Sequence, residues 1–144
     1  ALSMIPTKTG AASAVGDVLP ELKGKLDGMA IRVPTPTVSL LDFTFLTKKS
    51  FEIRELNEVL FKASKTNLRN VLEVNNIPLV SADFRGHMAS CIYDKAHTRK
   101  TDTVTKVLAW YDNEWAFSNR MLDVALYIKE NIATSNLASS ITNI

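Results

Sequence analysis

The chain has 144 residues, and 17 basic against 15 acidic side chains give it a formal net charge of +2. Charge this balanced gives no electrostatic argument for a nucleic-acid partner. A single cysteine excludes an intrachain disulfide framework and a cysteine-rich zinc site, and no apolar stretch is long enough to span a bilayer. The apolar fraction of 46% is that of an ordinary soluble globular protein.

The first half of the chain is predicted to carry two helices and two strands. Small, helix-tolerant residues predict a helix over 11–18, and a short apolar run predicts a strand over 29–33. Residues 38–47 alternate between a nearly apolar face and a mixed face, as in a half-buried strand. Apolar residues at helical spacing then predict a helix over about 51–65, with Ser50 as its N-cap.

The second half is richer in strands. Apolar runs predict strands over 68–74, 79–84, 88–94 and 104–111, and Ser118 is expected to cap a last helix. The strands cluster instead of alternating with helices, which predicts an α+β fold with a mixed, mostly antiparallel sheet. A nucleotide-binding start with the pattern G-x-G-x-x-G is absent from the sequence.

Two features of the first 36 residues could bind an anion. Thr9 and Gly10 stand where a helix begins, and unpaired N–H groups at the positive end of a helix attract phosphate. Thr9 could equally be a simple cap, which is the commoner role of such a residue. Arg32 interrupts an apolar run, where it could clamp a phosphate or carboxylate or could face outward from the polar side of a strand.

Residues 110–120, WYDNEWAFSNR, join the end of a strand to the start of a helix. Loops between rigid elements often carry sites, and Asn113 offers the donor and the acceptor that a carboxamide requires. The alternative is an aromatic core plug in which Asp112, Asn113 and Ser118 make only turn and cap hydrogen bonds.

Other reactive side chains carry no recognisable chemistry. Cys91 lies in a strand pattern with no basic neighbour that would activate it, so an inert, packed thiol is expected. His87 and His97 have no Cys, Asp or Glu at the spacing of a metal site, and no metal is expected. We find no Ser-His-Asp order and no G-x-S-x-G motif.

Long strings of the sequence resemble one enzyme family. The segment SMIPTKTGAASAVGDVLPELKGKLDGMAIRVPTPTVSLLD, the string PLVSADFRG and the segment KVLAWYDNEWAFSNRMLDVA are similar, in that order, to the catalytic domain of phosphorylating glyceraldehyde-3-phosphate dehydrogenase. The resemblance implies an α+β fold whose helices pack on one face of the sheet. It also implies oxidation and phosphorylation of glyceraldehyde 3-phosphate in a cytoplasmic homotetramer, with NAD as the cofactor and NADP as the alternative.

The resemblance gives roles to individual residues. Thr9 and Gly10 of the TGAA string would bind one of two phosphate groups, those of the substrate and of inorganic phosphate, and Arg32 would contact both. Asn113 would bind the nicotinamide carboxamide, and Phe117 would line the nicotinamide pocket. Ala116 stands where the family usually has glycine, and the polar run 95–105 has no functional counterpart.

The resemblance also defines what the chain lacks. The family's catalytic cysteine and base histidine belong to motifs that are absent here, so no catalytic residue is assigned and Cys91 does not replace the nucleophile. We therefore expect residues 1–133 to be part of a catalytic domain truncated on its N-terminal side, with a polar tail over 134–144. The chain alone should be inactive, with neither membrane nor nucleic acid among its partners.

Two alternatives stay open at this point. One is erythrose-4-phosphate dehydrogenase, a related enzyme, although the intact TGAA and WYDNE strings favour the glyceraldehyde enzyme. The other is a non-catalytic module that associates with itself. The sequence does not decide between NAD and NADP, or between a designed and a proteolytic N-terminal end.

Overall fold

This computed structural model describes residues 2–141, and side chains as far as residue 132. The chain divides into two units, and the first, Ala1–Pro36, consists of a hairpin and a short helix. Strand β1 (Ile5–Lys8) pairs antiparallel with β2 (Met29–Arg32). Between them lie helix α1 (Ala11–Val18) and the short 3-10 helix η1 (Pro20–Leu22).

A four-stranded sheet organises the second unit, Thr37–Ile144. Its order is β3-β6-β5-β4. All neighbours are antiparallel except β4 and β5, which are parallel. The register shifts within β5 between Asp94 and Arg99, so the hairpin that β5 forms with β6 carries an irregularity. The strands are β3 (Ser39–Leu46), β4 (Leu72–Asn75), β5 (Cys91–Thr101) and β6 (Val104–Tyr111).

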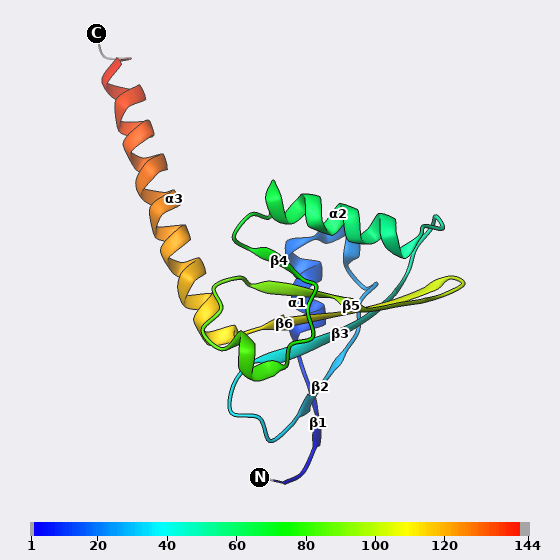
Figure 1. Ribbon diagram of the computed structural model, residues 1–144. Helices are drawn as coiled ribbons and strands as arrows, with labels where there is room; N and C mark the ends of the chain where they lie inside the picture. Colours follow the sequence, from blue (N-terminus) through cyan, green and yellow to red (C-terminus); the bar gives the residue numbers. More distant parts are fainter. Residues whose placement is uncertain (1, 142–144) are drawn as a thin grey trace. The chain divides into compact units, whose positions relative to one another are not determined.

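Two helices accompany this sheet. Helix α2 (Ile53–Lys65) packs against β4 and β5, and the Tyr93 hydroxyl donates to the Asn57 side chain across that contact. Helix α3 (Asn113–Ile141) begins two residues after β6 ends and runs away from the sheet (Figure 1). Among the described residues, no helix combines the length and the apolar character needed to cross a membrane.

The core of the second unit lies where a loop crosses the sheet face that carries Trp110. Phe84, at the end of the 3-10 helix η2 (Ser81–Phe84), stacks on the Trp110 ring with centroids 5.4 Å apart. Ala89 and Ile92 complete the buried cluster, and Val38 and Leu79 pack against it. The loop around η2 is therefore fixed to the sheet by aromatic packing.

The fold class predicted from the sequence is confirmed, but several elements differ. Residues 81–84 form η2 and not a strand, and β1 was not predicted. The N-cap of α2 is Glu52, whose backbone N–H is held by the Glu55 carboxylate at 2.7 Å, and not Ser50. The last helix begins at Asn113, before Ser118. It continues through Ile141, so the tail predicted from residue 134 is helical up to there, and residues 142–144 lie outside the described part.

Candidate functional site

Thr9 and Gly10 lie where β1 passes into α1. The Thr9 Oγ1 accepts a hydrogen bond from the backbone N–H of Ala11 at 3.2 Å, which leaves its own hydroxyl hydrogen available to donate. Gly10 is the N-cap residue with φ −87°, a conformation open to any residue. A Cβ at Gly10 would meet only the Ser13 hydroxyl, at 4.0 Å. The space beside this helix start is therefore open, and neither strain nor packing requires glycine there.

A shallow hollow of about 520 Å³ adjoins Thr9. It is lined by both strands of the hairpin and by the residues next to them: Pro6, Thr7, Lys8, Thr9, Asp27, Gly28 and Met29. Lys8 brings a positive charge to this hollow, whereas Asp27 brings a negative one. The Asp27 carboxylate is engaged locally, since it accepts the backbone N–H of Gly28 at 2.8 Å. Sequence reasoning missed Lys8, although its position inside the TKTG string was a signal.

Arg32 lies at the other end of the same hairpin. It pairs with Ile5, whereas Lys8, next to Thr9, pairs with Met29. Arg32 lies three residue steps along the strand from Met29, which is roughly 10 Å of backbone. The Arg32 side chain is exposed, as the outward-facing alternative predicted. Thr9 and Gly10 thus lie beside one end of the hairpin, and Arg32 lies at its other end.

Asn113 and Phe117 lie in the second unit, on the first turn and a half of α3. Four residues apart on a helix, they share one face. Both are exposed, and Phe117 is 66% accessible. The interpretation of residues 110–120 as a loop missed this spacing. An amide with donor and acceptor next to an aromatic face suits a carboxamide-bearing ring, so these residues fit the nicotinamide that the resemblance implies.

The neighbouring face of the same helix turn is buried. Asp112 and Ala116 are 5% and 4% accessible, respectively. The Asp112 carboxylate accepts the Trp115 N–H at 3.1 Å and the Gly86 N–H at 2.9 Å. The backbone N–H of Gly86, followed by those of Trp115 and Glu114, holds the Asp112 pKa below its ordinary value despite burial. Ala116 fits this buried helical position, where its methyl group packs inward.

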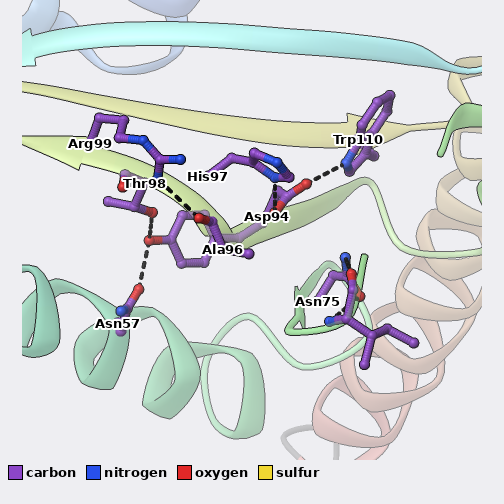
Figure 2. A network of polar contacts seen from close by, with 10 residues as sticks. Asn57, Asn75, Asp94, Ala96, His97, Thr98, Arg99 and Trp110 are labelled. Carbon is purple, nitrogen blue, oxygen red and sulfur yellow. Dashed lines mark hydrogen bonds and ion pairs between the residues drawn. The ribbon is translucent and has the colours of Figure 1, made fainter. Parts of the chain in front are cut away.

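A second buried carboxylate links β5 to β6 (Figure 2). Asp94, 1% accessible, accepts the Trp110 indole N–H at 3.0 Å, and its other oxygen lies 2.9 Å from the His97 Nδ1. Burial alone would raise the Asp94 pKa, but the hydrogen bonds from Trp110 and His97 lower it. The polar run 95–105 therefore contributes a hairpin and one member of this network.

Cys91 begins β5, and its partial burial raises the pKa of the thiol. A raised pKa keeps the thiol protonated and unreactive near neutral pH, as expected from the sequence. In the described part of the chain, no three His, Cys, Asp or Glu side chains gather as metal ligands.

The site residues thus fall into two sets, Thr9, Gly10 and Arg32 in the first unit and Asn113 and Phe117 in the second. The family model "Glyceraldehyde 3-phosphate dehydrogenase, C-terminal domain" matches residues 1–113. The α+β fold and this match define the chain as similar to the C-terminal domain of a dehydrogenase. The chain belongs to the glyceraldehyde-3-phosphate dehydrogenase family.

Curated relatives agree with that assignment. The chain is 53% identical over 125 residues to the chromosomal glyceraldehyde-3-phosphate dehydrogenase of Cupriavidus necator, which covers 87% of the chain and 37% of that relative. It is 54% identical over 124 residues to the Pseudomonas aeruginosa glyceraldehyde-3-phosphate dehydrogenase, and the match covers 86% of the chain and 36% of that relative. It is 50% identical over 132 residues to the Zymomonas mobilis glyceraldehyde-3-phosphate dehydrogenase, and the match covers 90% of the chain and 39% of that relative. The chain spans less than two fifths of the length of these relatives.

Proposed function

We propose that this chain supplies phosphate-binding and nicotinamide-orienting residues to an NAD-dependent dehydrogenase that oxidises and phosphorylates glyceraldehyde 3-phosphate. The observation that carries the proposal is the pairing of family membership with an open helix start at Thr9 and Gly10. Those two residues offer a hydroxyl donor and unpaired backbone N–H groups without any side chain in the way.

Arg32 has a separate part in this proposal. The Arg32 backbone lies roughly 10 Å along the hairpin from the Met29–Lys8 pair, and its side chain is exposed. In this proposal, Arg32 binds a second phosphate group and extends toward the first. One anion at Thr9 and Gly10 and another at Arg32 matches a reaction with a phosphorylated substrate and inorganic phosphate. Planar, bidentate donors make arginine suited to this role.

The cofactor-facing part belongs to Asn113 and Phe117. Bound nicotinamide would supply the hydride acceptor, which no side chain can provide. Asn113 would hold the carboxamide through its amide, and Phe117 would cover the ring with an apolar face. Phosphate binding and ring orientation are contributions of positioning and electrostatics, and bond-making groups must come from outside this chain.

The test uses the full 144-residue chain fused behind the N-terminal part of the C. necator enzyme. We expect phosphate-dependent NAD reduction with glyceraldehyde 3-phosphate, and less with erythrose 4-phosphate. The unfused chain should give none. Reduction of NAD by the unfused chain, or an inactive fused protein that is folded and tetrameric, would contradict the proposal. A preference for erythrose 4-phosphate would move the chain to the related enzyme.

Variants of the fused enzyme separate the two anion sites. Gly10→Ala places a methyl group in open space, so folding is kept while the anion is pushed from the helix start. The KM for inorganic phosphate should rise about tenfold, the loss of one charge-assisted hydrogen bond. Arg32→Lys should raise the KM values of both phosphate and aldehyde. Asp17→Ala, exposed on α1 beyond the first turn, is the matched control and should change neither.

A further inference from the structure

The Asp112 carboxylate does more than begin a helix. One oxygen caps α3 through the Trp115 N–H, whereas the other leaves the helix and binds the Gly86 N–H, 26 residues earlier in the chain. An ordinary N-cap satisfies donors of its own helix. Because both oxygens are used and the side chain is buried, the start of α3 is tied to the loop that follows η2.

The partner at the far end of this tie is itself held in place. Gly86 has φ +72°, a left-handed conformation that glycine adopts without strain. Two residues earlier, Phe84 stacks on Trp110, and Trp110 is anchored to Asp94. The loop thus meets the sheet through this ring stacking, and a hydrogen bond within the sheet holds the Trp110 ring in place. A rigid loop gives the Asp112 carboxylate a fixed point on which to orient the helix.

Along α3, the buried and exposed residues form two parallel rows. Asp112, Ala116 and the half-buried Arg120 follow one another at intervals of four, and the Arg120 guanidinium donates to the Asn70 carbonyl at 2.8 Å. Asn113 and Phe117 lie one position further along in each case, on the exposed row. An exposed side chain cannot be oriented by its own packing, so its direction depends on the anchored row beside it.

We propose that Asp112 is a positioning residue, which sets the direction of Asn113 and through it the face that the nicotinamide ring presents to the substrate. This inference rests on the proposed function. A small rotation of the first turn of α3 would displace the Asn113 amide, and misplacement of about 1 Å can cost about a hundredfold in rate. The chemistry is unaffected, because Asp112 touches no reacting atom.

The decisive variant is Asp112→Ser in the fused enzyme. Serine keeps an N-cap oxygen for the Trp115 N–H, but it offers only one oxygen and cannot also hold Gly86. We expect kcat to fall about ten- to a hundredfold, with the KM for phosphate unchanged, because the phosphate residues lie elsewhere. Asp112→Asn, which retains the shape and one acceptor, should recover part of kcat.

A purely structural role for Asp112 would not change the stereochemistry of hydride transfer. With an aldehyde deuterated at the reacting carbon, proton NMR shows which face of the nicotinamide receives deuterium. Asp112→Ser should place some deuterium on the wrong face, as should Asn113→Ala, whereas Asp42→Ser on β3 should not. Transfer to a single face with unchanged kcat in Asp112→Ser would overturn the inference.

The design distinguishes two kinds of failure. If the parent fused enzyme is folded but inactive, the proposed function fails, whatever Asp112 does. If the parent is active and Asp112→Ser does not fold, Asp112→Asn becomes the deciding variant. Strict single-face transfer with unchanged kcat in Asp112→Asn then overturns the inference, and mixed transfer supports it.

Discussion

Two buried aspartates determine much of the local order in the second unit. Asp94 joins β5 and β6 through His97 and Trp110, and Asp112 joins the start of α3 to Gly86. Each carboxylate is desolvated, yet each has its pKa lowered, because donors surround the ionised form. Their charge is therefore part of the folded state, in contrast to the exposed ion pair of Asp42 and Lys106.

Asp94→Ala should destabilise the second unit. It leaves the Trp110 N–H without its acceptor, and the loss of a charge-assisted hydrogen bond predicts about 2–3 kcal/mol at neutral pH. His97→Ala, a half-exposed member of the same network, is the matched control and should cost less. Urea unfolding followed by tryptophan fluorescence gives these free energies of unfolding.

The difference in unfolding free energy between the parent protein and Asp94→Ala should depend on pH. A carboxyl group whose pKa is lowered on folding stabilises the folded protein when the pH is above the pKa of that group in the unfolded chain, about 3.9. This stabilisation is lost as the pH falls through the lower pKa of the folded state. The difference between the unfolding free energies of the parent and Asp94→Ala should therefore shrink below about pH 4. A difference that stays constant through the acid range would show that the Asp94 charge contributes nothing.

At the scale of elements, local patterns predicted what local interactions determine. The helix over 11–18 and the strand over 104–111 appear with the predicted bounds, because small residues and alternation act within a few positions. The predicted start of α3 at Ser118 is too late because Asp112, which caps the helix through the Trp115 N–H, lies in a segment interpreted as a loop. The apolar run over 79–84 predicts a strand, and this prediction is wrong. Aromatic packing of Phe84 on Trp110 fixes these residues, and not hydrogen bonds to a neighbouring strand.

In the candidate site, too, local features could be predicted from the sequence and distances between elements could not. Thr9 and Gly10 were found because a helix start is a local feature. Asn113 was singled out from its amide chemistry and Phe117 through the family resemblance, but their shared helix face depends on where α3 begins. The distance of Arg32 from Thr9 follows from the hairpin register, and β1 was not predicted.

Within the first unit, Gly16 is a position where packing leaves little room for a side chain. A Cβ there would lie 3.0 Å from the Lys23 Cα, a backbone atom that cannot swing aside. Gly16→Ala should gain up to about 1 kcal/mol in helix propensity but lose about 1–3 kcal/mol to the overlap. We expect a net loss, seen as faster hydrogen exchange of the α1 amides. Gly28→Ala, whose Cβ would make an ordinary 3.8 Å contact with the Ala12 Cβ, is the control. Equal exchange in both variants would contradict the packing argument.

At the scale of the whole molecule, α3 presents an apolar surface out of proportion to its contacts. Its exposed large apolar side chains are Trp115, Phe117, Met121, Leu122, Val124, Leu126, Tyr127, Ile128 and Ile132. A concentration of exposed apolar side chains on one helix is typical of a contact region. The relatives are longer than this chain, which spans less than two fifths of their length.

The 144-residue chain studied by itself should therefore associate with itself. A net charge of +2 supplies little repulsion, so apolar side chains of α3 on separate molecules are free to bury one another. Sedimentation velocity should show a weight-average mass that increases with concentration. Leu122→Glu with Leu126→Glu adds charge on one side of α3 and should restore the monomer. Val59→Glu, an equally exposed apolar position on α2, should not. If the unsubstituted chain sediments as a monomer at every concentration, the exposed surface of α3 does not drive association.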